Sequence, residues 1–287
     1  MKNIKYFLQF IIIIFLFAIF KLIGLKYSSI FSGRFFTLIG PLFRSKDLSH
    51  SNLSRALPDL NENQKIKILK QMWSNYGKMF AEYMFIRNYR ESLKFSDRII
   101  VENQKELDLI KDESKPVIFI SGHFNNFELM AMHIEKSGID LAAIYRPLNN
   151  KFLNPIMEKI RKKYICKKQI KKGISGTKEI LKNFRNGTSL ALMIDQRVSE
   201  GILSKFFNEK ALTTTIPAQF IKKFDAKVVP IYIERLENNM FKLKIYKPLK
   251  FQKSDNQEFI TQSLNKTLEE MILRNPEQWI WTHNRWK

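Results

Sequence analysis

Short runs of aliphatic and β-branched residues alternate with amphipathic stretches from residue 92 onward. The short runs predict strands, and the stretches, whose apolar residues recur every three or four positions, predict helices. Alternation of this kind is typical of an α/β fold in which helices flank a mixed central sheet. The expected strands are residues 117–121, 141–145, 189–195, 228–234 and 241–246, and the expected helices are residues 127–137, 153–164, 176–186, 216–224 and 257–274.

Residues 61–83 predict a further helix ahead of the alternating region, because their large apolar side chains recur at intervals of three and four. Pro58 and Asn61 mark its start. The sequence contains no internal repeat and no low-complexity linker. We therefore expect one folded domain, which covers residues 49–287.

Residues 6–25 are almost wholly apolar. At 1.5 Å per residue such a helix spans roughly 30 Å, which is the thickness of the hydrocarbon layer of a bilayer. A cleaved signal peptide is the alternative, because Lys2 and Lys5 precede the apolar run. The run is followed by Lys26 and by no small-x-small cleavage site, which favours a retained membrane anchor over residues 1–30.

A second apolar segment, residues 35–43, is too short to span a bilayer. It fits either a segment that rests in the headgroup layer or a part of the protein core. We expect residues 31–48 to form an interfacial connector between the anchor and the domain. Basic residues flank the anchor on both sides, so the positive-inside rule gives it no orientation.

The strand expected at 117–121 is followed by Gly122 and His123, with Glu128 five residues further on. Side chains five apart on one helix point about 140° away from each other, so His123 and Glu128 cannot meet on an unbroken helix. A sharp turn at Gly122, with a following asparagine as the helix cap, would let them converge. His123 is then a candidate general base, with Glu128 as the carboxylate that orients it. No nucleophile accompanies the pair, so we expect it to act on a substrate hydroxyl.

Other polar residues follow predicted strands, where an α/β sheet usually holds its ligands. Arg146 follows the strand at 141–145, and Asp195 and Gln196 stand at the end of the strand at 189–195. Arg161 lies on the intervening helix and suits a phosphate or a carboxylate. A carboxylate after so apolar a strand needs a partner, so Asp195 is expected either to orient a substrate or to pair with an arginine such as Arg146 or Arg161. We expect all four residues to bind substrate.

The chain carries 49 Lys and Arg against 27 Asp and Glu, a net charge of +22, which indicates an anionic partner. Anionic lipid, an acidic carrier protein and nucleic acid all qualify, but no nucleic-acid-binding module is recognisable, so we expect no nucleic acid. Four histidines without a His-x-x-x-His pair argue against a metal site. The single cysteine, Cys166, excludes an intramolecular disulfide and suits a reducing cytosolic face.

Four segments occur in the order seen in one known family: residues 122–128, 145–150, 195–196 and 276–287. Residues 52–58 also resemble the asparagine-leucine-proline stretch that precedes the first soluble helix of that family. Together they make residues 49–287 similar to the bacterial lipid A late acyltransferases, the family of lauroyl and myristoyl transferases within the lysophospholipid acyltransferase superfamily. The ordered set is far more specific than any single motif.

The resemblance implies a glycerol-3-phosphate acyltransferase-like fold, anchored in the bacterial inner membrane with its catalytic domain on the cytoplasmic face. It implies transfer of a fatty acyl chain from acyl carrier protein to a hydroxyl of a lipid A precursor, without a cofactor or a metal. His123 would be the general base and Glu128 its partner, while Arg161 and Asp195 match positions that the family needs for activity. A backbone N–H near His123, or Arg161, would stabilise the oxyanion. The alternative is a different lipid acceptor, such as a lysophospholipid or an aminolipid.

Overall fold

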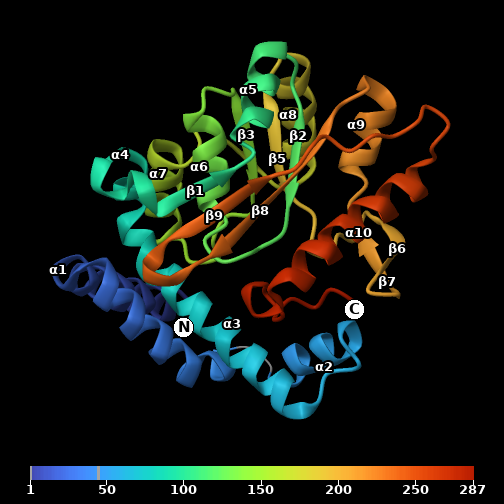
Figure 1. The fold of residues 1–287 in the computed structure, drawn as a ribbon. Helices are drawn as coiled ribbons and strands as arrows, with labels where there is room; N and C mark the ends of the chain where they lie inside the picture. The colour runs from blue at the N-terminus through green and yellow to red at the C-terminus, as the bar shows by residue number, and fades with distance from the viewer. Residues whose placement is uncertain (1, 44–45) are drawn as a thin grey trace.

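The computed structural model describes residues 2–43 and 46–287, which form a seven-stranded sheet flanked by helices (Figure 1). Neighbouring strands are parallel except at the antiparallel β8–β9 pair, so the sheet is mixed. The predicted fold class is therefore confirmed. The strand order is β1 (Ile99–Glu102), β9 (Phe241–Ile245), β8 (Val228–Arg235), β2 (Ile118–Ser121), β5 (Ser189–Met193), β3 (Leu141–Tyr145) and β4 (Lys168–Lys171).

The helices and strands predicted from residue 61 onward begin and end within two residues of those in the structure. Sequence patterns missed β1, β4 and a separate two-stranded hairpin, β6 (Ile202–Phe206) and β7 (Glu209–Thr213). They also missed three helices, at Lys46–Ala56, Ile86–Glu91 and Gln104–Glu113. β4 reads Lys-Gln-Ile-Lys at the edge of the sheet and buries only Ile170, so it lacks an apolar run. The helices after α1 (Lys2–Phe43) are α2 (Lys46–Ala56), α3 (Glu62–Glu82), α4 (Ile86–Glu91), α5 (Gln104–Glu113), α6 (Glu128–Lys136), α7 (Asn154–Tyr164), α8 (Ile174–Arg185), α9 (Ile216–Phe224) and α10 (Gln257–Arg274).

The central strand β2 has all four residues buried. Successive side chains of a strand point to opposite faces, so both faces of the sheet are covered here. The register pairs Ser121 of β2 with Met193 of β5. His123 and Asp195 each follow two residues later, and they therefore leave the sheet at the same level on neighbouring strands.

The helix predicted at 61–83 is α3, and its start is fixed by a capping box. The side chain of Asn61 accepts from the Gln64 backbone N–H at 3.0 Å, and the side chain of Gln64 accepts from the Asn61 backbone N–H at 2.9 Å. Each contact satisfies a donor that the first helical turn leaves unpaired. α3 packs against α1 on one side and against the C-terminal segment that follows α10 on the other.

The N-terminal helix α1 (Lys2–Phe43) is broken at Gly24, where φ is 80° and ψ is 167°, a conformation open mainly to glycine. It is the one helix among the described residues whose length and apolar composition would let it cross a membrane. The sequence suggested that the anchor ends at residue 30. In the structure the helix is broken earlier, at Gly24, and then continues past residue 30.

The second half of α1 approaches α3 closely through small residues. The Ser32 hydroxyl donates to the Gly77 carbonyl at 2.7 Å, and a Cβ on Gly77 would lie 2.2 Å from the Ser32 carbonyl oxygen. On the opposite side, Leu38 and Leu42 stay largely exposed. One side of this segment thus packs on the domain and the other is an exposed apolar surface, while its place in a headgroup layer stays a prediction.

A buried ion pair joins α3 to the sheet. Glu82 is fully buried and accepts two hydrogen bonds from the guanidinium of Arg235, at the end of β8. The amides of Asn126 and Asn239 each donate to the same carboxylate at 3.3 Å, and Asn239 also donates to Ser29 of α1 at 2.7 Å. One carboxylate therefore connects α1, α3 and β8 with the loop that follows His123.

Replacing Glu82 with alanine is expected to lower the free energy of unfolding by about 3–5 kcal/mol, because it leaves the buried Arg235 cation without a partner. Thermal and urea unfolding of the detergent-solubilised protein measures the loss. The exposed pair of Glu113 and Lys227 is the control. Glu113→Ala is expected to cost about 0–1 kcal/mol, so equal losses in the two variants would contradict the assigned importance of the buried pair.

Candidate active site

His123 is held by Asp195 at two points. The backbone N–H of His123 donates to Asp195 Oδ2 at 2.8 Å, and the ring Nδ1 lies 2.8 Å from Asp195 Oδ1. A Cβ on Gly122 would lie 3.3 Å from the same carboxylate, so the residue before His123 must be small for the approach. Asp195 is 1% exposed. The carboxylate thus lies beneath the imidazole and fixes its orientation.

The surroundings keep Asp195 ionised. Burial alone would raise its pKa, but the charge and hydrogen bonds of His123 and a hydrogen bond from the indole of Trp279 at 2.9 Å lower it to about 2. Burial lowers the pKa of His123, whereas the Asp195 carboxylate raises it, and the net shift is upward. An ionised partner makes Nδ1 the donor, which leaves the lone pair of the neutral ring on Nε2. Nε2 is therefore the nitrogen able to accept a proton.

Glu128 does not form the predicted hydrogen bond with the imidazole of His123. Its carboxylate oxygen Oε1 instead accepts from Arg161 Nε at 2.8 Å and from Arg161 Nη2 at 2.6 Å. Glu128 is the first residue of α6, and its side chain meets Arg161 of α7. The residue that holds His123 is Asp195, which follows the neighbouring strand β5. The prediction failed because it paired residues close in the chain and could not see the β2–β5 register.

The four residues predicted to bind substrate have different positions. Arg161 and Gln196 line the cavity that also contains His123. Asp195 lies buried under His123 and pairs with it, which corrects the predicted pairing with Arg146 or Arg161. The side chain of Arg146 is exposed and is not among the residues that line the cavity, so its contact with substrate stays a prediction.

The segment after α10 supports the loop that carries His123. The Gln278 side chain accepts from the Arg235 backbone N–H at 2.8 Å and donates to the Arg235 carbonyl at 3.1 Å. The Gln278 carbonyl accepts from the Asn125 backbone N–H at 3.1 Å, and Trp279 forms a β-bridge with Phe124. Sequence patterns alone did not find Gln278 and Trp279, since only their tertiary contacts connect them with the site.

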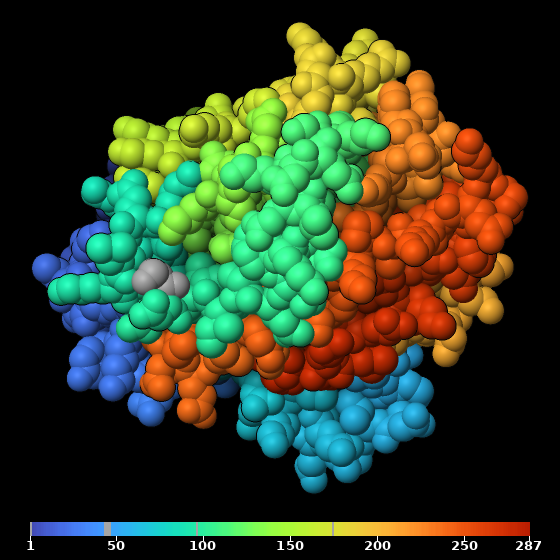
Figure 2. Space-filling model, turned by 45° about the horizontal axis from the view of Figure 1, so that its top comes forward, coloured from blue at the N-terminus to red at the C-terminus, as the bar shows by residue number. Residues whose placement is uncertain are grey.

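The same segment is held from outside by α2. The Asn52 amide donates to the carbonyls of Trp281 and His283, at 2.9 Å and 2.7 Å. Figure 2 shows α2, in light blue, projecting from the molecule directly beneath the red C-terminal segment. The residues under the site are therefore fixed by contacts on two sides.

The cavity at His123 has a volume of about 440 Å³ and is walled mainly by apolar side chains. Its polar residues include His123, Glu128, Arg161 and Gln196. The apolar wall comes mainly from α1, α3, α7 and the residue before α7, and it includes Ile13, Phe17, Met72, Met79, Phe80, Leu153 and Met157. Such a shape suits a substrate with a long hydrocarbon part and a reactive polar end.

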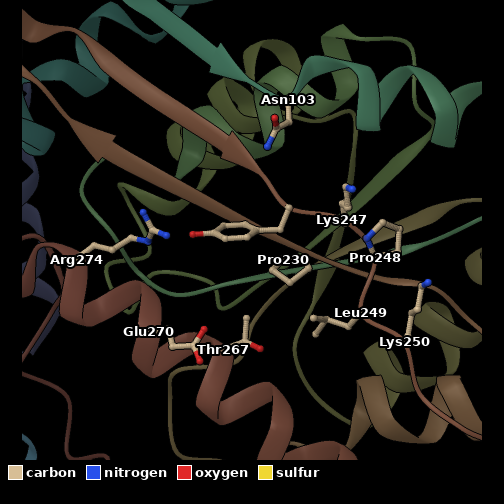
Figure 3. A pocket seen from close by; sticks show the side chains of 10 residues that line it. Asn103, Pro230, Lys247, Pro248, Leu249, Lys250, Thr267, Glu270 and Arg274 are labelled. Atoms are coloured by element: carbon tan, nitrogen blue, oxygen red, sulfur yellow. The ribbon is translucent and has the colours of Figure 1, made fainter.

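A second cavity, of about 480 Å³, lies between α10 and the segment that follows β9 (Figure 3). His123 follows β2, which runs parallel to β8, whereas β9 runs antiparallel to β8. The segment after β9 therefore lies at the opposite end of the sheet from His123. Its charged side chains are Lys247, Lys250, Glu270 and Arg274, and it contains no base comparable with His123. Within the described residues, no three His, Cys, Asp or Glu side chains converge as metal ligands would. The cavity at His123 is therefore the candidate active site.

Comparison with known proteins gives a consistent result. Residues 1–287 match the profile of the family described as bacterial lipid A biosynthesis acyltransferase. The chain is 23% identical over 240 residues to lipid A biosynthesis acyltransferase 2 of Shigella flexneri, covering 80% of this chain and 74% of that protein. It is 22% identical over 252 residues to the lipid A biosynthesis lauroyltransferase of Escherichia coli K12, covering 85% and 79%. A lipid A biosynthesis acyltransferase of Haemophilus influenzae is 20% identical over 247 residues, covering 83% and 74%.

Proposed function

Because the chain belongs to the bacterial lipid A biosynthesis acyltransferase family, we propose that it transfers a fatty acyl chain from the thioester of acyl carrier protein to a hydroxyl of a lipid A precursor. Family membership supports acyl transfer in lipid A biosynthesis. The donor, the base and the acceptor position are the proposed part. The observation that carries the proposal is the pair of His123 and Asp195 at the polar part of a largely apolar cavity.

In the proposed reaction, Nε2 of His123 removes the proton from the acceptor hydroxyl as its oxygen attacks the thioester carbonyl. The ionised Asp195 stabilises the imidazolium that forms. The tetrahedral intermediate then collapses, the carbon–sulfur bond breaks, and the proton on His123 passes to the departing thiolate. The products are an ester on the acceptor and free carrier-protein thiol, so no covalent acyl-enzyme is formed.

We propose that Arg161 stabilises the negative charge that develops on the thioester carbonyl oxygen. Its guanidinium lines the cavity and is held by Glu128 through two hydrogen bonds. A preorganised cation in a site that excludes water stabilises such an oxyanion strongly. Glu128 then acts on the reaction through the position of Arg161, and Gln196 is the other polar side chain that we propose contacts the substrate.

The protein is proposed to act at the cytoplasmic face of the bacterial inner membrane, anchored by the apolar first half of α1. Support comes from the length and composition of α1 and from the net charge of +22, which suits an acidic carrier protein and a phosphorylated glycolipid. Ile13 and Phe17 of the same helix line the cavity. The proposed anchor thus also forms part of the wall for the acyl chain.

Replacing Met79 with tryptophan is expected to shift the preferred donor toward acyl chains two carbons shorter, because the larger side chain fills part of the apolar cavity. Burial of two methylenes contributes about 1.6 kcal/mol, so the ratio of rates for the two donors should change about tenfold. Competition between carrier-protein thioesters of different lengths, followed by mass spectrometry, measures the ratio.

The matched control is Ile66→Trp, at an exposed position of the same helix that does not line the cavity. This variant should keep the wild-type preference. The assignment of the acyl chain to this cavity fails if Met79→Trp leaves the ratio unchanged, or if both tryptophans change it equally.

The proposed function is tested with purified, detergent-solubilised protein, acyl carrier protein thioesters of several lengths and a tetraacylated, sugar-extended lipid A precursor. A mass gain of one acyl group on the glycolipid is the expected result. A parallel reaction with a lysophospholipid acceptor separates the two acceptor classes. Acylation of the lysophospholipid alone would show that the acceptor is another lipid. No transfer to either acceptor would refute the proposal.

A further inference from the structure

His283 lies in the C-terminal segment and is fixed through both its backbone and its ring. Its carbonyl accepts from the Asn52 amide and from the Arg285 backbone N–H, at 2.7 Å and 2.9 Å. Its ring Nε2 lies 3.0 Å from the backbone nitrogen of Arg197, in the loop that follows β5. The side chain therefore has one fixed orientation.

The contact with Arg197 also determines where the ring carries its proton. A backbone N–H can only donate, so Nε2 of His283 must offer its lone pair. Burial lowers the pKa of His283 to about 4, so the ring is neutral at neutral pH. A neutral imidazole has one N–H, which must then be on Nδ1. His283 thus presents a donor at Nδ1.

That donor has no acceptor among the described residues, since the ring makes its hydrogen bond through Nε2 alone. Nδ1 is also not one of the polar atoms that are sealed in the core without a partner. His283 lines the cavity that contains His123. Because Nδ1 is not sealed in the core, a molecule that occupies the cavity can reach it and accept its hydrogen bond.

We propose that His283 is a second catalytic side chain whose Nδ1–H donates a hydrogen bond to the oxygen that gains negative charge during acyl transfer. This inference rests on the proposed function. The two histidines of the cavity differ in the groups that hold them. A carboxylate holds His123 and leaves a proton acceptor on its free nitrogen, whereas a backbone N–H holds His283 and leaves a proton donor. Removal of one such donor typically lowers kcat by about 10²-fold to 10³-fold.

Two substitutions separate a catalytic role from a structural one. Asparagine carries its amide nitrogen close to the position of Nδ1, so His283→Asn keeps the donor and loses the contact with Arg197. Glutamine carries its amide oxygen close to the position of Nε2, so His283→Gln keeps that contact and loses the donor. We expect His283→Gln to lower kcat about 10²-fold with little change in KM, and His283→Asn to retain clearly more activity. Thermal unfolding of both variants identifies losses caused by the fold.

The reverse order, with His283→Gln the more active variant, would overturn the inference and leave His283 as an anchor for Arg197. A direct readout is independent of activity. In ¹⁵N-histidine NMR of the detergent-solubilised protein, with the His283→Asn spectrum as the assignment control, Nδ1 should be the protonated nitrogen. A proton on Nε2 would also overturn it. If the wild type transfers no acyl group, the proposed function fails, while the NMR result still decides the state of His283.

Discussion

The His123→Ala variant is expected to lose acyl transfer by about 10³-fold or more while it keeps its fold. A general base contributes typically 10²-fold to 10⁴-fold, and here the same ring also returns the proton to the leaving thiolate. Substrate binding should change little, because the apolar wall and Arg161 remain. Initial rates at saturating donor, with thermal unfolding as a check on the fold, measure the effect.

His133→Ala is the matched control. His133 lies on α6, bonds to the Gln104 side chain at 2.8 Å and does not line the cavity. Burial lowers its pKa to about 4, so its loss removes no charge at neutral pH. This variant should transfer acyl chains at nearly the wild-type rate. Substantial turnover by His123→Ala, or an equal loss of rate in both variants, would contradict the assignment of His123 as the general base.

The Asp195→Asn variant is expected to lower kcat by about 10²-fold or more, because the neutral amide no longer stabilises the imidazolium and no longer selects the N–H on Nδ1. The pH profile should change as well. The neutral ring is the active form, so kcat/KM falls as the pH drops below the pKa of His123. Asp195 raises that pKa against the opposing effect of burial. Without the carboxylate the pKa falls, and the acidic limb moves to lower pH.

Glu128→Gln provides the comparison, since Glu128 contributes to the raised pKa of His123 less than Asp195 does. It should lower the rate by loosening Arg161 and move the acidic limb less than Asp195→Asn does. The assignment of Asp195 as the partner of His123 fails if the larger shift of the limb occurs in Glu128→Gln.

Local patterns in the sequence predicted most of the elements, because each pattern acts within a few residues. The capping box at Asn61 and the buried runs of β2 and β5 are examples. Edge strand β4 was missed because its exposed lysines give no apolar run. Short or edge elements draw their stability from neighbours that the local sequence does not contain.

The candidate site was predictable residue by residue but not contact by contact. His123, Asp195, Arg161 and Glu128 were all identified from their types and their places beside strands or on helices. Their pairing was not, since Asp195 is 72 positions away from His123 and meets it only through the strand register. Arg146 is an arginine like Arg161 and follows a strand as Asp195 does, yet its side chain is exposed. The direction in which a side chain points depends on tertiary packing, whereas the place of a residue beside a strand can be predicted from the local sequence.

The support of the His123 loop by Gln278 and Trp279 has a consequence for the order of events during synthesis. Chains are made from the N-terminus, and domains fold as their parts emerge. The apolar first helix is therefore available for membrane insertion long before Trp279 exists to reach Asp195. If the first half of α1 is the proposed anchor, the chain would reach the membrane before the proposed His123–Asp195 pair gains the support of Trp279, and acyl transfer would start only after that support has formed.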